Sequence, residues 1–458
     1  MKKITLLIIA TIFPLLLHSQ CWFSVSTGGA HTLGIGADKS LWAWGRNNVG
    51  QLGKGDFTNV SIPIKIGTDL NWNQVTCGNA HSMALKSDGT IWTWGRNLLG
   101  QLGNGLPGNL AFPTQMGTLN NWVFISAGSD FSAAIKADGT LWTWGENTYG
   151  QLGDGTFGAT QNKSTPVQVG TDTNWLIVSA GNNHTIAIKT DGTLWAFGQN
   201  NTGQLGDGTN IDKAFPVQVG TDNNWQSISA SLHSVALKNN GSLWTWGLNT
   251  NGQLGDGTVV DKNTPINIDP TNTFNKIARG IQHVITERSN GTLWSNGLNI
   301  SGQLGDATVI AKSIPTAVNT VVNTWRLITS RFSHCAGIKT DGTMYMWGSN
   351  LYGQLGNGAT ASAVSTPVGI VCPTLASNNF NLNVGFSIYP NPTNGILNID
   401  LTDDLEISRI VITDLTGKIV FNQMENLKTI NVQELSNGLY IIQIFSDQKV
   451  LQGKFIKK

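Results

Sequence analysis

The chain has 458 residues, which is more than one ordinary domain, so two or more folded units are expected. Its formal net charge is +1, and charged residues make up 12% of it, about half of the usual share of roughly 25%. Lys and Arg are not clustered, which argues against nucleic acid as a partner. A charge-poor chain rich in Gly, Asn and Thr is typical of a β protein with many turns.

Residues 1–19 predict a secretory signal peptide. Two lysines precede an apolar run over residues 4–17, which is too short to span a bilayer comfortably. Cleavage after Ser19 would leave Gln20 at the new N-terminus. Lipidation of Cys21 is the alternative, but Gln20 stands where a lipobox normally has a small residue. No other long apolar run follows, so we expect an exported mature chain without a transmembrane segment.

The next 350 residues or so repeat themselves with a period near 50, which is the spacing of propeller blades and not of helical solenoids. Each unit holds four short β-rich runs, here called strands A to D, separated by turn residues. An Asp-Gly or Asn-Gly pair between B and C predicts a tight type I′ hairpin, although the first unit has Asp38-Lys39 there. We therefore predict an all-β fold, with a seven-bladed β-propeller over residues 20–372. The seven GQLG copies that mark the units begin at Gly50, Gly100, Gly150, Gly203, Gly252, Gly302 and Gly353.

Tryptophan and histidine follow this repeat closely. Every Trp either starts a strand A or belongs to the W-x-W of a strand C, so none is left over to stack on a sugar. Residues two apart in a strand share a face, so a pair such as Trp142 and Trp144 is expected to be buried between blades. One His starts strand B in six units, and Phe131 replaces it in the third. Because these histidines define the repeat, we interpret them as structural, each bonded to a neighbouring backbone group.

The unit G-x-x-H-T-x-A-[LI]-x-x-D-G-x-[LI]-W-x-W-G-x-N-x-x-G-Q-L-G resembles the regulator of chromosome condensation repeat over residues 22–371. This resemblance implies a seven-bladed propeller. The best-known eukaryotic member is a nucleotide exchange factor for a nuclear GTPase, and a secreted bacterial relative inhibits β-lactamase. The fold carries over but the function does not, because one propeller hosts many binding roles. The signal peptide also separates this chain from any cytosolic GTPase.

A second domain follows a linker at residues 373–385. Residues 386–458 contain no Trp, His or Cys, and their alternating segments divided by Asn-Gly and Thr-Gly predict a small β-sandwich. They resemble the type A C-terminal sorting domain of the type IX secretion system in Bacteroidetes. The resemblance implies the secretion machinery as a partner, export through the periplasm, removal of the domain, and release or attachment at the cell surface. The motifs that carry it are YPNP at 389–392, DLTG at 414–417 and NGLY at 437–440.

Catalytic patterns find little support. H-E-x-x-H, G-x-S-x-G and Cys-x-x-Cys do not occur, and no Lys-Ser or Lys-Thr follows GQLG as in a P-loop. Asp154, Asp207 and Asp256 lack the spacing of an EF-hand and are interpreted as turn residues. The best carboxylate pair is Asp130 with Glu146, which we do not expect to be catalytic. We therefore predict no enzyme, cofactor or metal.

A binding site is expected where the loops vary. Antiparallel strands alternate in direction, so the A–B and C–D loops of all units emerge on one face. Variation concentrates there, either because the face is selected for binding or because unconstrained turns have drifted. Arg and Tyr are common interface anchors. The candidate ligand face consists of Arg46, Arg96, Leu98, Leu99, Glu146, Tyr149, Phe332 and Tyr352.

The cysteines suggest how the ring closes. Inside the repeat, a short connection joins strand D of one unit to strand A of the next. When the end of the last unit and the start of the first are aligned with such a connection, Cys372 and Cys21 both fall within it. A disulfide between them would replace the missing peptide link, and export to an oxidising compartment permits it. Cys77 and Cys335 fit no such plan and are expected to be buried free thiols.

Three functions remain open. The first is an exported, non-catalytic binding or adhesion module for an extracellular protein or glycan. The second is a secreted inhibitor or modulator of a specific enzyme. The third, and least favoured, is a polysaccharide-acting enzyme.

Overall fold

The computed structural model describes residues 21–320, 324–371, 386–401, 406–414, 418–424, 428–446 and 450–458. The predicted signal peptide and the predicted linker lie outside these residues. Every regular element in the described residues is a β-strand, and among them no helix is long and apolar enough to cross a membrane. The chain divides into two units, Met1–Pro373 and Thr374–Lys458.

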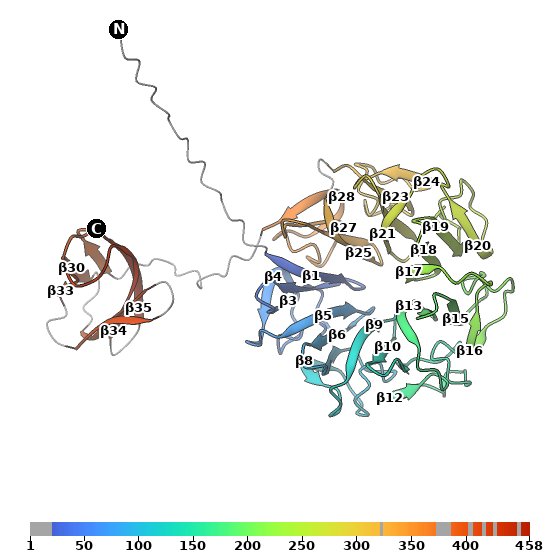
Figure 1. Cartoon of the computed structure of the whole chain (residues 1–458), viewed down its shortest axis with the longest axis horizontal. Helices are drawn as coiled ribbons and strands as arrows, with labels where there is room; N and C mark the ends of the chain where they lie inside the picture. Colours follow the sequence, from blue (N-terminus) through green and yellow to red (C-terminus); the bar gives the residue numbers. More distant parts are fainter. Residues whose placement is uncertain are drawn as a thin grey trace, which may run out of the picture. The chain divides into compact units, whose positions relative to one another are not determined.

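The first unit consists of seven four-stranded antiparallel sheets, here called blades 1 to 7, which follow one another in chain order (Figure 1). Blades 1 to 3 contain β1 (Trp22–Thr27), β2 (His31–Gly36), β3 (Leu41–Gly45), β4 (Val60–Ile66); β5 (Trp72–Cys77), β6 (His81–Lys86), β7 (Ile91–Gly95), β8 (Leu110–Gln115); and β9 (Trp122–Ala127), β10 (Phe131–Lys136), β11 (Leu141–Gly145), β12 (Lys163–Gln168).

Blades 4 to 7 repeat this order of strands. They contain β13 (Trp175–Ala180), β14 (His184–Lys189), β15 (Leu194–Gly198), β16 (Lys213–Gln218); β17 (Trp225–Ala230), β18 (His233–Lys238), β19 (Leu243–Gly247), β20 (Lys262–Ile268); β21 (Phe274–Arg279), β22 (His283–Arg288), β23 (Leu293–Gly297), β24 (Lys312–Ala317); and β25 (Trp325–Arg331), β26 (His334–Lys339), β27 (Met344–Asn350), β28 (Ala361–Ile370).

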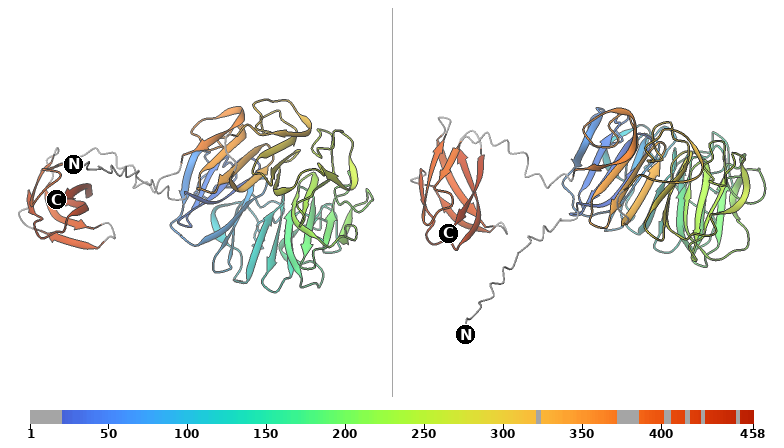
Figure 2. Two further views of the ribbon diagram at one scale, coloured as in Figure 1. Left: turned by 45° about the horizontal axis from the view of Figure 1, so that its top comes forward. Right: turned by 90° about the horizontal axis from the view of Figure 1, so that it is seen from above.

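The first strand of each blade lies nearest the centre of the ring. The strands β1, β5, β9, β13, β17, β21 and β25 contact one another in this order, and β25 also contacts β1. The fourth strands lie on the outer rim, as Figure 1 and the tilted views of Figure 2 show. The A–B and C–D loops therefore surround the ring axis on one face.

The turn between strands B and C differs from the predicted type I′ hairpin. Only the second residue of the Asp-Gly pair has a positive φ, as at Gly89 (81°), so the turn is a type I turn followed by a left-handed residue. In blade 1 this left-handed residue is Lys39 (65°). The Asp side chain explains why Asp precedes a hydroxyl residue by two positions at this turn, because Asp88 accepts hydrogen bonds from the N–H and hydroxyl of Thr90. The Thr90 hydroxyl in turn accepts a bond from Trp92 Nε1 (3.0 Å).

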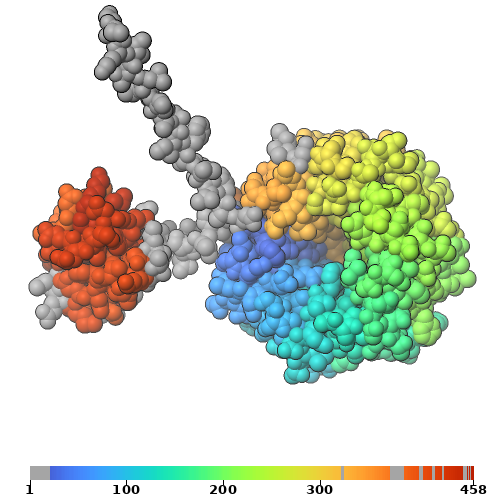
Figure 3. All heavy atoms as spheres, in the orientation of Figure 1, coloured from blue at the N-terminus to red at the C-terminus, as the bar shows by residue number. Residues whose placement is uncertain are grey.

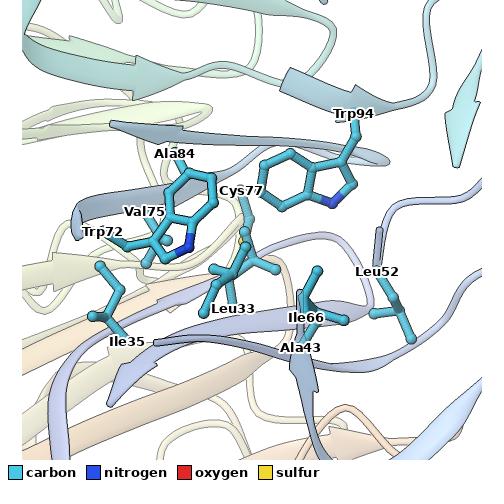
Figure 4. Packing of buried hydrophobic residues seen from close by; sticks show 11 residues of the cluster. Leu33, Ile35, Ala43, Leu52, Ile66, Trp72, Val75, Cys77, Ala84 and Trp94 are labelled. Carbon is cyan, nitrogen blue, oxygen red and sulfur yellow. The ribbon is translucent and has the colours of Figure 1, made fainter. Parts of the chain in front are cut away.

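Adjacent blades are joined by the GQLG loop, which packs against the next blade. The Gln51 carbonyl of blade 1 accepts a hydrogen bond from Trp94 Nε1 (2.9 Å) and another from the Ser82 hydroxyl (2.7 Å), both in blade 2. A Cβ at Gly53 would lie 2.9 Å from Trp94 Nε1, so the second Gly of the motif is required by this close approach as well as by its φ of 75°. Figure 4 shows the shared core, with Leu33 and Leu52 of blade 1 against Trp72 and Trp94 of blade 2.

The predicted burial of the W-x-W pair is correct for the second Trp and partly correct for the first. Trp144 is fully buried, and its Nε1 donates to the Gln101 carbonyl (3.0 Å). Trp142 is only half-buried and lies at the start of β11, next to the B–C turn. There Lys136 Nζ lies 3.7 Å from its ring centroid, and Thr140 accepts a bond from its Nε1.

The histidines bridge blades through hydroxyl groups and not through the backbone groups that the sequence suggested. His31 Nε2 lies 3.0 Å from Ser82 Oγ, and His184 Nε2 lies 2.8 Å from Ser234 Oγ of the next blade. In blade 5 this contact is missing because Val284 replaces the hydroxyl residue, and both ring nitrogens of His233 lack a partner among the described residues. The histidines nevertheless belong to the scaffold, since all six are buried.

The ring closes by the same packing that joins the other blades. No strand is exchanged between blades 1 and 7, and their shared core contains Trp22 and Trp44 with Met344 and Leu355. The Thr32 hydroxyl donates to the Gln354 carbonyl (2.8 Å) and lies 3.1 Å from His334 Nε2. Closure therefore has a non-covalent basis, to which a disulfide would add.

The second unit contains two antiparallel sheets that share one cluster of buried side chains. Phe386 and Ile399 of the first sheet pack with Ile410, Ile442 and Phe455 of the second. The sheets consist of β29 (Phe386–Tyr389), β30 (Ile396–Leu401) and β33 (Thr429–Asn431), and of β32 (Ile419–Gln423), β31 (Ile407–Thr413), β34 (Gly438–Ser446) and β35 (Val450–Lys457).

Cysteine chemistry gives a first testable prediction. Cys77 and Cys335 are buried free thiols, and burial raises the pKa of Cys77 to about 12. Cys21 is a disulfide cysteine, whereas its predicted partner Cys372 lies outside the described residues, so this pairing stays a prediction. We expect peptide mapping of oxidised secreted protein to recover a linked Cys21–Cys372 peptide. Free thiol labelling at both positions would contradict it.

A second prediction concerns pH. Burial lowers the pKa of five of these histidines to about 3 and holds that of His233 well below its usual value, whereas an unfolded histidine titrates near pH 6.5. As pH falls below about 6.5, unfolding takes up protons that the folded ring does not bind, so stability is lost. Calorimetry of the secreted protein should show a constant Tm above about pH 7 and a falling Tm between about pH 6.5 and 4.

The control is His184→Phe, which copies the Phe131 that blade 3 carries at this position. This variant should take up about one proton fewer on unfolding, so its free energy of unfolding should fall less steeply as the pH falls. A Tm independent of pH over this window would contradict the assignment.

Candidate functional site: a cavity on the loop face

A cavity of about 540 Å³ opens between the loops of blades 7, 1 and 2. Its walls combine A–B loop residues with C–D loop residues, so the two kinds of loop meet here. The A–B loops contribute Gly29, Ala30, Asn79, Ala80, Phe332 and Ser333, and the C–D segments contribute Arg46, Asn48, Val49, Gln51, Arg96, Leu98, Ser349, Tyr352 and Gln354.

Backbone hydrogen bonds hold these loops in place. The Arg46 N–H donates to the Ala30 carbonyl (2.8 Å), and the Arg96 N–H donates to the Ala80 carbonyl (2.9 Å), which ties each C–D loop to its own A–B loop. The glutamine of GQLG fixes the loop tip, since Gln354 Oε1 accepts a bond from the Tyr352 N–H (2.9 Å). These bonds therefore hold the walls of the cavity to their own blades.

Two arginines and three apolar side chains give the cavity its chemistry. The Arg46 guanidinium lies 4.8 Å from the Tyr352 ring centroid, a cation–π contact between blades 1 and 7. Leu98 is 69% exposed. Phe332 is half-buried and has a φ of 49°, in the left-handed region that a bulky side chain rarely adopts. The lining residues include no carboxylate, so the cavity offers positive charge next to apolar surface.

The second arginine has a partner beside the cavity. Arg96 Nη1 lies 3.5 Å from Asp130 Oδ1, which also accepts a bond from Gln101 Nε2 (3.0 Å). Glu146 accepts a bond from the Thr148 hydroxyl (3.0 Å). Burial raises the pKa of Glu146, and the Asp130 carboxylate acts in the same direction. Asp130 thus contacts side chains of blade 2, and Glu146 contacts a hydroxyl of its own loop. In the described residues no group of three or more His, Cys, Asp or Glu is placed to hold a metal.

The cavity contains part of the candidate ligand face. Arg46, Arg96, Leu98, Phe332 and Tyr352 line it. Leu99, Glu146 and Tyr149 do not line it, although Tyr149 occupies in blade 3 the repeat position that Tyr352 occupies in blade 7. Sequence analysis missed the polar walls at Asn48, Asn79 and Ser349, because no residue type distinguished these turns from the other copies.

Comparisons with known proteins match both units. The regulator of chromosome condensation (RCC1) repeat matches residues 38–85, 88–135, 138–188, 191–237, 240–286 and 341–381, which together make up more than half of the chain. The secretion system C-terminal sorting domain matches residues 387–458. No curated protein matches the chain.

Several solved structures share the propeller. Human WBSCR16 is 23% identical, with a TM-score of 0.63, 70% of this chain covered and 86% of that chain. Yeast RCC1 (Prp20), solved with Kap60, is 20% identical, with a TM-score of 0.65 and coverage of 81% and 87%. A second structure of Prp20p from Saccharomyces cerevisiae is 21% identical, with a TM-score of 0.64 and coverage of 81% and 90%. At these identities the likeness concerns the fold alone.

Five of the six repeat matches run from the B–C turn of one blade into strand B of the next, so they include the GQLG loop and the strands on which this loop packs. The sequence pattern thus spans the junction between blades. The chain belongs to the regulator of chromosome condensation (RCC1) repeat family.

Proposed function

We propose that this chain is an exported, non-catalytic binding protein that uses the cavity between blades 7, 1 and 2 to hold a carboxylate-bearing segment of an extracellular protein. The observation that carries the proposal is the pair of arginines in a cavity whose lining has no carboxylate. Arg46 makes a cation–π contact with Tyr352 and is free of an ion pair among the described residues, so its guanidinium can pair with an incoming acid.

The cavity favours a protein over a glycan. Its apolar walls at Leu98, Phe332 and Tyr352 suit a hydrophobic or aromatic side chain next to the acid, as in protein interfaces anchored by Arg and Tyr. None of the tryptophans of the propeller lies in the lining, so the flat indole surface that commonly stacks on sugars is lacking there. The solved relatives do not define the partner, and the match to a sorting domain supports a partner outside the cell.

Export supports this assignment. The C-terminal unit matches a sorting domain, which indicates secretion or display at the cell surface. We propose that the type IX machinery recognises residues 386–458 and that the mature protein consists of the propeller. Inhibition of one specific secreted enzyme is a special case of the same binding mode, in which the carboxylate-bearing segment belongs to that enzyme.

The binding test compares equivalent positions of the repeat. Immobilised secreted protein is probed with a peptide array rich in Asp, Glu and aromatic residues, and with a uronic-acid polysaccharide array. Arg46→Gln and Tyr352→Ala should each weaken peptide binding by about tenfold or more, or roughly 1.4 kcal/mol. Tyr149→Ala is the matched control and should leave affinity unchanged.

Stability serves as the second readout. The loop variants should change the free energy of unfolding by less than about 0.5 kcal/mol, whereas Trp144→Ala in the core should cost about 3–5 kcal/mol. Equal losses of affinity in the Tyr149 and Tyr352 variants, or binding of the polysaccharide alone, would count against the proposed site.

Processing provides a separate prediction. If residues 386–458 act as a sorting signal, extracellular protein should begin near Gln20 and lack most of these residues, because the signal is removed during export. Intact-mass measurement of the secreted material tests this. Recovery of protein that still ends at Lys458 would contradict removal of the domain.

A further inference from the structure

Two arginines break the repeat at the inner ends of the innermost strands. The sixth residue of strand A is small or short in six blades, and Arg279 takes this position in blade 6. The following residue is Gly or Ser in six blades, and Arg331 takes this position in blade 7. The small residues at the first position are Thr27, Cys77, Ala127, Ala180, Ala230 and Ser330, and those at the second are Gly28, Gly78, Gly128, Gly181, Ser231 and Gly280.

Both side chains reach across the centre of the ring. Arg279 Nη2 donates to the Ala180 carbonyl of blade 4 (3.2 Å), and Arg331 Nη1 donates to the Ala127 carbonyl of blade 3 (2.5 Å). The acceptors belong to the inner strands of blades that are not adjacent to the donors' blades, so both side chains extend past the neighbouring blade toward the centre of the ring. Arg279 and Arg331 are only 6% and 5% exposed. Figure 3 shows the packed atoms of the blades that enclose this centre.

These buried charges lack a counter-charge. Neither arginine forms an ion pair in the described part of the chain, and Asp130, which attracts Arg331, is paired with Arg96. Arg279 Nε and Arg331 Nε and Nη2 are buried without an acceptor among the described residues. Burial and repulsion from Arg331 lower the pKa of Arg279, and burial lowers that of Arg331 to about 10.

The surrounding groups do not relieve this imbalance. The six histidines near the axis have lowered pKa values and are neutral at pH 7, and burial keeps the Cys77 thiol protonated. Two unpaired guanidinium groups in a low-dielectric site are strongly destabilising, because an arginine does not lose its proton to escape the cost. An anion at this place would remove the cost and accept the unused N–H groups.

We infer that the centre of the ring binds a small inorganic anion of the halide class between Arg279 and Arg331. The expected donors are Arg279 Nε and Arg331 Nε and Nη2. The two guanidinium groups belong to blades 6 and 7 and already donate to carbonyls of blades 4 and 3. An anion bound to both groups would therefore strengthen the link between these four blades. This site is independent of the loop-face cavity.

Bromide is the probe, because it scatters anomalously and resembles chloride. Crystals of the secreted protein grown in bromide should show an anomalous peak within hydrogen-bond distance of both guanidinium groups. The Tm in solution should rise with the logarithm of bromide concentration at constant ionic strength, with methanesulfonate replacing bromide, because an anion bound only to the folded ring stabilises it by mass action.

The chain itself supplies the variants. Arg279→Ala and Arg331→Gly restore the residues that other blades carry at these positions, so the ring is expected to fold. The double variant should lose both the central peak and the specific rise of Tm with bromide. Arg288→Met is the matched control, because Arg288 pairs with Asp269 (2.6 Å) away from the axis, and it should retain both signals.

A centre without an anomalous peak would overturn the inference. So would a bromide dependence of Tm that is equal in the parent and in the double variant, since that result would show a general salt effect and not a site.

Discussion

The ring depends on the carbonyl group of the GQLG glutamine. This oxygen belongs to a loop of one blade, yet it accepts hydrogen bonds from the next, as Gln51 does from Ser82 and Trp94. The histidine of the first blade lies against the same hydroxyl, so one buried polar chain crosses the junction between blades 1 and 2. Because a buried acceptor without a donor is costly, the blades are held in one angular relation and not merely pressed together.

This junction tolerates substitution where the chemistry is kept. In blade 6, Asn296 stands at the place of the second Trp, and its Nδ2 still donates to the Gln253 carbonyl (2.9 Å). In blade 7, Cys335 stands at the place of the hydroxyl residue, and its Sγ lies 3.3 Å from the Gln303 carbonyl. The donor is therefore retained while the side chain varies. Val284 is the exception, because its side chain has no donor and His233 is left without this contact.

A rigid ring of this kind leaves two regions free to differ. On the loop face, the glutamine side chains fix the backbone of the C–D loops, so that substitutions at Arg46, Leu98 and Tyr352 change the surface without changing the scaffold. At the axis, the inner strands approach one another so closely that small residues are the rule. The two arginines there replace small residues with large cations, and they give the centre of a nearly neutral chain a local positive charge.

Much of this protein could be predicted from the sequence. The period of GQLG and the alternation of strands A to D determine seven blades, and the change of composition after Cys372 marks the second unit. These are local features, because each depends on the spacing of residues within about fifty positions. The family resemblance rests on the same local pattern, and the match to the RCC1 repeat confirms it.

The tertiary structure decided the turn type, the contacts between blades and the lining of the cavity, which the repeat pattern does not specify. The B–C turn is not type I′, because Asp88 uses its side chain to hold Thr90 and keeps an ordinary φ. The histidine contacts a hydroxyl of the next blade, about fifty residues away. Alignment of the repeats shows that the units carry such a hydroxyl, but it does not show that the hydroxyl lies against the histidine of the preceding blade. The cavity takes in Tyr352 and leaves out Tyr149, although both occupy the same place in their units. The sequence alone determined which residues recur. Closure of the ring decided which residues they contact across the junctions and across the axis, because it brings segments far apart in the chain together, such as residue 32 and residue 334.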